Sequence, residues 1–308
     1  MHEPREGQAM TPSEQYPTVK QVHDSFQKAI ENEPAYKEIL PFFQSLYEMQ
    51  VAALEATRPE EISLPPEILK AKLTGEMPLI ERQQVTLDQA SATLLLRAIL
   101  TAAKSANHQL AAAANLLKEY LDTDESPLEQ GHRMFLDKDR DGLRRLCEKI
   151  GIAVEMLDFF LYNSIWPSLA RHARRLSTEH KLNGSFHKGY CPICGALPEI
   201  SFLSETGQRF LVCRFCRHQW SVKRIQCPFC GNNEAETIGY HFSDDDKARR
   251  IDTCDQCKNY IINIDTRHLS RAFYPPLEAL VATHLDIKAE QLGYQRAVDL
   301  NYQDLEFL

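Results

Sequence analysis

The sequence lacks a long hydrophobic run and an excess of basic residues, and these two absences exclude several classes of protein. Its most apolar stretch, Leu94 to Ala103, is interrupted by Arg97, and none reaches the 18 residues that a membrane-spanning helix needs. We therefore expect neither a membrane span nor a signal peptide. Lys and Arg number 35 against 43 Asp and Glu, a net charge of -8, which argues against a protein that coats nucleic acid or an anionic membrane.

Recognisable catalytic motifs are also missing. There is no Walker loop, dinucleotide-binding glycine fingerprint, nucleophile elbow or H-E-x-x-H motif. The stretch from Asp137 to Glu148 formally fits an EF-hand calcium loop, but four basic residues cancel its four acids. We interpret these acids as the start of a helix, and Cys147 in that helix as a half-buried core thiol. The sequence thus indicates a protein that is not an enzyme.

Glycine is scarce in the first 180 residues, which hold only five of the twelve glycines. Apolar residues there recur at steps of three and four, the spacing that is typical of amphipathic helices. Helices are expected over 39–54, 87–114, 128–135 and 143–176. We therefore predict an all-helical domain over residues 16–184, preceded by a disordered polar tail over residues 1–15.

The pattern changes beyond this domain to short alternating runs, which are typical of β-strands. Strands are expected over 199–203, 209–212, 237–242 and 260–264. The overall prediction is a mainly α protein with two tandem β-rich modules, rubredoxin-like or zinc-ribbon in type. The first four-cysteine ribbon spans residues 185–225 and the second spans 226–268. A C-terminal helix within residues 269–308 is expected to pack on the helical domain.

Eight of the nine cysteines form four C-x-x-C pairs, and this is the most informative pattern in the chain. Without an export signal the compartment is expected to be the reducing cytoplasm, where clustered cysteines are more often metal ligands than disulfides. Eighteen residues separate the first pair from the second, and 23 separate the third from the fourth, close to the spacing of four-thiolate sites. The predicted metal ligands are Cys191, Cys194, Cys213, Cys216, Cys227, Cys230, Cys254 and Cys257.

Sequence order favours two ions per chain, one held by the first two pairs and one by the last two, over a cross-braced arrangement. Each ion is iron or zinc, because both accept a thiolate tetrahedron. Protein fills all four positions at each site, so the sites are expected to be structural, with electron transfer possible only for iron. Redox disulfide chemistry is a further alternative.

The residues around the pairs fit this interpretation. Gly195 and Gly231 follow two of the pairs and permit the left-handed backbone of a tight metal-binding turn. Four thiolates around a divalent ion carry a net charge of about -2, which nearby basic residues can compensate. The basic residues are Arg214, Arg217, Lys223 and Arg224, and the rings expected to pack around the sites are Tyr190, Phe215, Trp220, Phe229 and Tyr260.

The order of motifs over residues 185–300 resembles a known family, the formate dehydrogenase accessory protein FdhE. The residues that carry the resemblance are Y-C-P-I-C-G-A-L-P-E from Tyr190, G-Q-R-F-L-V-C-R-F-C-R-H-Q-W from Gly207, V-K-R-I-Q-C-P-F-C-G from Val222, D-T-C-D-Q-C-K-N-Y-I-I-N-I-D from Asp252, A-T-H-L-D from Ala282 and G-Y-Q-R from Gly293. One departure is that Glu278 and Ala279 stand where the family is expected to have two adjacent acids.

This resemblance implies a cytoplasmic, non-catalytic factor that contacts the catalytic subunit of respiratory formate dehydrogenase before export by the twin-arginine route. It also implies rubredoxin-like metal centres formed by the eight paired cysteines. Two other functions stay open at this point. An electron carrier requires bound iron with reversible redox chemistry, and a nucleic-acid-binding ribbon requires steeply salt-dependent binding, which the acidic composition argues against.

Overall fold

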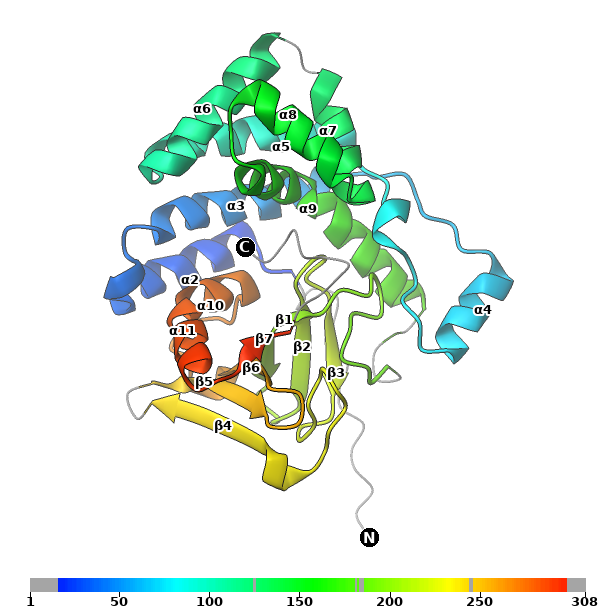
Figure 1. Ribbon diagram of the computed structural model, residues 1–308, viewed down its shortest axis with the longest axis vertical. Helices are drawn as coiled ribbons and strands as arrows, with labels where there is room; N and C mark the ends of the chain where they lie inside the picture. The colour runs from blue at the N-terminus through cyan, green and yellow to red at the C-terminus, as the bar shows by residue number, and fades with distance from the viewer. Residues whose placement is uncertain (1–15, 124–125, 181, 183–185, 244–245, 298–308) are drawn as a thin grey trace. The chain divides into compact units, whose positions relative to one another are not determined.

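The chain contains one helical unit and one unit built on a β-sheet, as the computed structural model describes it (Figure 1). The described residues are 16–123, 126–180, 182, 186–243 and 246–297, so the tail predicted for residues 1–15 lies outside them. The helical unit comprises Thr18–Leu69 and Ile80–Arg175. Among the described residues, the sheet unit comprises residues 16–17, Lys70–Leu79 and residues 176–297.

The helical front that the apolar spacing predicts is confirmed. Its largest buried side chains include Phe26, Phe135, Phe160 and Trp166, each less than 3% exposed, and they form the inner faces of the helices. The helices are α2 (Val19–Asn32), α3 (Leu40–Ala56), α4 (Pro66–Thr74), α5 (Gln89–Ala102), α6 (His108–Thr123), α7 (Ser126–Asp137), α8 (Arg140–Ile150) and α9 (Val154–Glu179). No described helix has both the length and the apolarity that crossing a membrane requires.

The region that resembles an EF-hand is a helix start, as the sequence indicates. Asp139 is the N-cap of α8, and its side chain accepts a hydrogen bond of 2.8 Å from the backbone N–H of Gly142. Cys147 lies inside α8 and is 5% exposed, and burial raises the pKa of its thiol to about 11. The expected helix over 143–176 is interrupted at Gly151, whose φ of +84° ends α8 before α9 begins.

A buried histidine in α7 provides a test of this unit by pH. His132 is fully buried between Gln89 and Ser164, and burial lowers its pKa to about 3. In the unfolded chain this imidazole is protonated below about pH 6.5, whereas in the native state it stays neutral down to about pH 3. The free energy of unfolding therefore falls as the pH drops below 6.5. Between pH 7 and pH 5, the free energy of unfolding of His132→Gln should fall by about 2 kcal/mol less than that of the wild type, as measured by urea unfolding at both pH values. Equal losses in both proteins would contradict this prediction.

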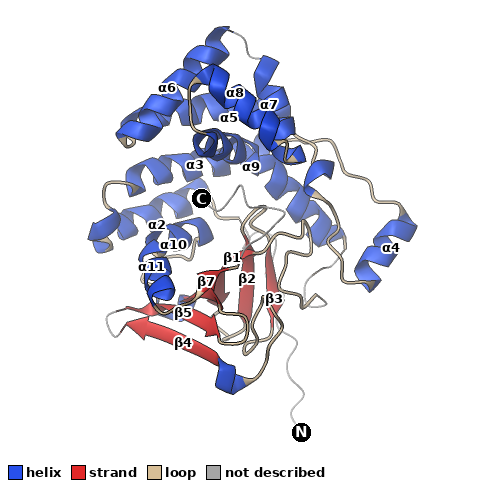
Figure 2. Ribbon diagram, viewed as in Figure 1, coloured by secondary structure: helices blue, strands red, loops and turns tan. Residues whose placement is uncertain are grey.

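The two four-cysteine ribbons share one continuous sheet, in the order β3-β2-β1-β6-β5-β4, with β7 beside β6 (Figure 2). They meet where β1 and β6 pair in parallel, with Phe202 opposite Ile264. The four expected strands correspond to β1, β2, β4 and β6, whereas β3, the charged β5 and the short β7 are additional. The strands are β1 (Pro198–Leu203), β2 (Arg209–Cys213), β3 (Gln219–Val222), β4 (Ile238–Ser243), β5 (Asp246–Cys254), β6 (Asn259–Asp265) and β7 (Gln295–Arg296).

The last helices, α10 (Pro275–Val281) and α11 (Thr283–Gln291), pack on this sheet. Ala282 and Ala289 belong to the same buried cluster as the sheet residues Ile200 and Ile262. The expected packing of this segment on the helical domain stays a prediction, and its last residues lie outside those described.

Glu278, the acid at the departure from the family pattern, is fully buried in α10. Its carboxylate accepts two hydrogen bonds of 2.9 Å from Arg271 and one of 3.2 Å from Arg249 of β5. Burial raises the pKa of Glu278, and the two guanidinium groups oppose that rise. A buried acid with two arginine partners ties α10 to the sheet, which is a structural role.

Candidate metal centres

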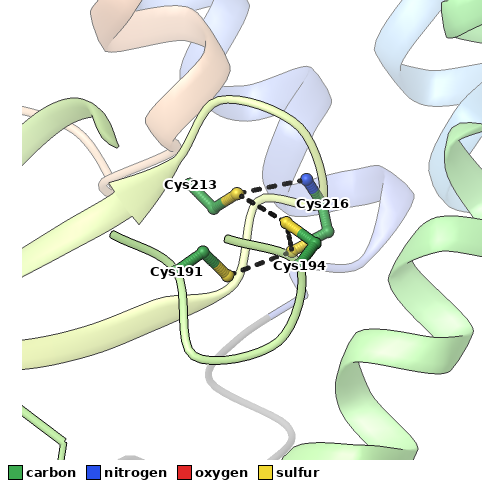
Figure 3. Close-up of side chains that lie close together, drawn as sticks. All are labelled: Cys191, Cys194, Cys213 and Cys216. Carbon is green, nitrogen blue, oxygen red and sulfur yellow. Dashed lines mark hydrogen bonds between the residues drawn. The ribbon is translucent and has the colours of Figure 1, made fainter. Parts of the chain in front are cut away.

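The first two C-x-x-C pairs converge in one cluster (Figure 3). Cys191 and Cys194 lie in the turn before β1, whereas Cys213 ends β2 and Cys216 lies in the turn before β3. The Sγ atoms of Cys191 and Cys216 are 3.6 Å apart, those of Cys194 and Cys213 are 3.5 Å apart, and those of Cys194 and Cys216 are 3.7 Å apart. All four residues are buried.

The last two pairs form a second cluster of the same kind. Cys227 and Cys230 lie in a turn before β4, Cys254 ends β5, and Cys257 lies in the turn before β6. The Sγ atoms of Cys227 and Cys257 are 3.6 Å apart, and those of Cys230 and Cys254 are 3.7 Å apart. The chain therefore groups its pairs in sequence order, not in the cross-braced arrangement.

The sulfur positions fit a four-coordinate metal ion. Four sulfurs placed about 2.3 Å from a central ion at tetrahedral angles lie about 3.8 Å from one another. Five of the separations are 3.5 to 3.7 Å, close to that value, and all the sulfurs of each cluster lie within 4.8 Å of one another; the donor set suits either zinc or iron. Four protein ligands leave no position for a substrate. Both clusters are thus compatible with metal binding of the structural type.

One backbone turn is repeated at all four pairs. The residue after each second cysteine donates its N–H to the carbonyl oxygen of the first cysteine, over 2.8 to 3.1 Å. Each of these residues has a positive φ, as expected for Gly195 and Gly231. Sequence reasoning missed the other two because they are not glycines. The φ values are +79° for Gly195, +58° for Arg217, +76° for Gly231 and +60° for Lys258.

The turns also aim hydrogen-bond donors at the sulfurs. In the first cluster the backbone N–H groups of Phe215 and Cys216 each lie 3.4 Å from Sγ of Cys213. In the second cluster the side-chain amide of Asn232 donates to Sγ of Cys254 over 3.5 Å. Burial raises the pKa of Cys254, but backbone donors and Asn232 outweigh it and lower the pKa to about 7. Such donors favour the thiolate form that binds metal.

A segment distant in sequence covers the first cluster, and no sequence pattern pointed to it. The backbone N–H of Leu79 donates to the carbonyl oxygen of Pro192, between the two cysteines of the first pair, over 3.0 Å. The hydroxyl of Tyr190 donates to the carbonyl oxygen of Glu76 over 2.8 Å. We call residues 76–79 the cover segment. It closes the solvent side of the turn that holds Cys191 and Cys194.

The cover segment makes the two glycine turns unequal, which a matched pair of substitutions can test. A Cβ at position 195 would lie 2.9 Å from Cγ of Pro78, whereas at 231 its nearest neighbour would be Gln226 Nε2 at 3.9 Å. In both variants the alanine must adopt a left-handed backbone conformation, which costs about 1–2 kcal/mol. Gly195→Ala should therefore lower the free energy of unfolding by at least about 1 kcal/mol more than Gly231→Ala, as measured by urea unfolding of metal-loaded protein. Equal losses in the two variants would contradict this prediction, because they would show that Pro78 moves away from a Cβ at position 195 without a measurable cost.

The charged residues near the clusters only partly follow the prediction. Arg214 is 8% exposed and its Nε lies 3.8 Å from Glu199, whereas Lys223 and Arg224 are exposed. Sequence reasoning missed Arg209, which is 2% exposed. Its guanidinium donates to the carbonyl oxygen of Gln226, the residue before Cys227, over 3.0 Å. Burial lowers the pKa of Arg209, and the charges of Asp252 and Cys227 oppose that change.

Arg209 also joins the two ribbons. It lies on β2 of the first ribbon, and its Nη2 is 3.0 Å from Oδ2 of Asp252 on β5 of the second. Of the rings expected to pack around the sites, Phe215, Trp220 and Tyr260 are at most 3% exposed, and Tyr260 belongs to the apolar core of the sheet. The indole N–H of Trp220 donates to the carbonyl oxygen of Lys188 over 2.9 Å. The other two rings, Tyr190 and Phe229, are partly buried.

Comparison with known proteins points to one family. A family model described as the central domain of FdhE matches residues 190–224, which contain the whole first cluster. The Protein FdhE homolog of Aquifex aeolicus is 36% identical over 148 residues, which are 47% of this chain and 51% of that protein. Protein FdhE of Escherichia coli is 29% identical over 145 residues, 43% of this chain and 45% of that protein. The chain spans about half the length of the curated relatives it matches.

The fold extends this likeness over nearly the whole chain. The crystal structure of the FdhE protein from Pseudomonas aeruginosa superposes with a TM-score of 0.63, covering 93% of this chain and 96% of that one. Its sequence is 20% identical, so this comparison shows a common fold. The family model, the curated relatives and the solved structure agree, and all of them support the FdhE family as the one that this chain is similar to.

Proposed function

We propose that this chain is a formate dehydrogenase accessory protein, a maturation factor that acts without catalysing a reaction itself. The likeness to FdhE proteins, over about half of the chain in sequence and nearly all of it in fold, is the observation that carries this proposal. The two clusters are consistent with it, because their ligands all come from the protein and leave no position for substrate activation. The partner in this proposal is the catalytic subunit of respiratory formate dehydrogenase, bound in the cytoplasm before export.

We further propose that the eight paired cysteines bind two metal ions, iron or zinc, one in each cluster. Sulfur separations of 3.5 to 3.7 Å and donors aimed at the sulfurs support this assignment. Each ion would hold two turns that lie at the ends of different strands. The sheet unit would then depend on the metal for its shape, as small metal-binding modules generally do. The metal sites would keep the client-binding protein folded and would not catalyse a reaction.

A pull-down tests the client and the metal on the same sample. Purified, metal-loaded protein should retain the isolated formate dehydrogenase catalytic subunit, and metal analysis of that protein should find two ions per chain. Cys147→Ser is the matched control, because this thiol lies outside both clusters, and it should leave both results unchanged. A loaded and folded protein that fails to retain the subunit would contradict the client assignment. A folded protein without zinc or iron would contradict the metal assignment.

A further inference from the structure

The two clusters differ in their access to solvent, although their sulfur geometry is nearly the same. All four cysteines of the first cluster are buried, and Cys191 and Cys213 have no exposed surface. In the second cluster Cys230 is exposed and Cys257 is intermediate, whereas its other two cysteines are buried. One half of the second cluster therefore faces solvent.

Identifiable groups enclose the first cluster. Ile193, Ala196 and Phe215, which lie in or beside its turns, are at most 1% exposed. Over one of these turns lies the cover segment, with Leu79 bonded to Pro192 and Pro78 against Gly195. An incoming ligand would have to displace this packing before it reached a sulfur.

The matching turn of the second cluster is only partly covered, since Gly189 lies against the carbonyl group of Pro228 but leaves the far end of the turn exposed. Pro228 and Phe229, between its first two cysteines, are only partly buried, and Cys230 itself is exposed. Among the described residues no side chain packs against Gly231 as closely as Pro78 packs against Gly195, because a Cβ at Gly231 would meet its nearest atom, Nε2 of Gln226, only at 3.9 Å. An incoming ligand therefore meets less packing at Cys230 than at any cysteine of the first cluster.

We propose that the second cluster is an exchangeable metal site, open to small thiol ligands at Cys230 and Cys257, whereas the first cluster holds its ion permanently. The step is a ligand substitution: the sulfur of an incoming thiol bonds to the metal, the bond from the metal to Cys230 breaks, and the proton of the thiol passes to Cys230. Oxidation states do not change. The inference rests on the metal assignment above and is independent of the client.

Metal release from the two-zinc protein tests this asymmetry. The protein is mixed with glutathione and a zinc-binding dye, 4-(2-pyridylazo)resorcinol, and release is followed by colour. One zinc per chain should leave at least tenfold faster than the other. Alkylation by iodoacetamide during the fast phase, mapped by mass spectrometry, should modify Cys230 and Cys257 ahead of the four cysteines of the first cluster.

Two variants show which cluster gives the fast phase of zinc release and which gives the slow phase. Cys230→Ser should bind one zinc per chain or release the second faster still, with the slow phase unchanged. Tyr190→Phe, which removes the hydroxyl bonded to the cover segment, should speed only the slow phase. Release of both ions at one rate, or first alkylation in the first cluster, would overturn the proposed asymmetry while leaving two metal sites in place. A folded protein that binds no zinc or iron would instead overturn the metal assignment, and this inference with it.

Discussion

Cys194→Ser is expected to bring the metal content from two ions per chain to one and to unfold much of the sheet unit. Structural zinc sites contribute about 10–16 kcal/mol of apparent binding free energy, which exceeds the total stability of many domains, about 5–15 kcal/mol. The sulfur of Cys194 is buried and lies 3.5 Å from that of Cys213 and 3.7 Å from that of Cys216. A serine hydroxyl there is a poor metal ligand, and the burial of the site keeps water from taking the vacant position. Loss of the ion also frees the turns that flank β1, β2 and β3.

Metal analysis and circular dichroism together measure this effect. Most of the helical signal should persist, because the helical unit is held by its own core, whereas the cooperative thermal unfolding of the sheet unit should be lost. Cys147→Ser should keep both ions and a native melting curve, since this buried thiol lies in α8 and away from both clusters. Two ions per chain in purified Cys194→Ser protein would refute the assignment of this ligand.

Arg209→Gln is expected to lower the free energy of unfolding by about 3 kcal/mol. Removing one member of a buried ion pair typically costs about 3–5 kcal/mol, because the remaining charge stays desolvated. Asp252 keeps a second partner, Arg250 at 2.7 Å, which places the expected cost at the lower end. The substitution also leaves the carbonyl oxygen of Gln226 without its donor from Arg209, directly before the first cysteine of the second cluster.

Urea unfolding of the metal-loaded protein measures this loss. Arg267→Gln is the matched control, because Arg267 pairs with Asp265 at 2.6 Å but its side chain is 41% exposed. Exposed pairs contribute about 0–1 kcal/mol, so this control should change little. If the two variants lose the same free energy, Arg209 does not join the ribbons in the way that its contacts with Asp252 and Gln226 indicate.

Much of the candidate site follows from short-range patterns in the sequence. C-x-x-C pairs can be recognised because two ligands of one ion must lie in the same tight turn, and the distance to the next pair limits which turns can meet. The same locality explains why the left-handed turns at Gly195 and Gly231, and the helix start at the acids that precede α8, were predicted correctly. Each depends on hydrogen bonds to residues only a few positions away.

The remaining features depend on contacts between distant segments, which leave no periodic pattern. Pairing of β1 with β6 merges the two ribbons into one sheet, and Arg209 reaches Asp252 across that sheet. A Cβ at Gly189 would overlap the carbonyl group of Pro228, so the approach of these two turns requires a glycine there. None of these requirements can be inferred from neighbouring residues.

The eight sulfurs and their grouping were therefore readable from the chain, because metal coordination demands fixed residue types at short spacings. Which cluster is sealed and which is open was decided only by tertiary packing. The segment that covers Cys191 and Cys194 lies more than 100 residues upstream in the chain, at residues 76–79, whereas at the second cluster Gly189 approaches Pro228 and Cys230 stays exposed. Burial depends on which surfaces meet in the folded chain, and identical C-P-x-C-G turns can thus have different access to solvent.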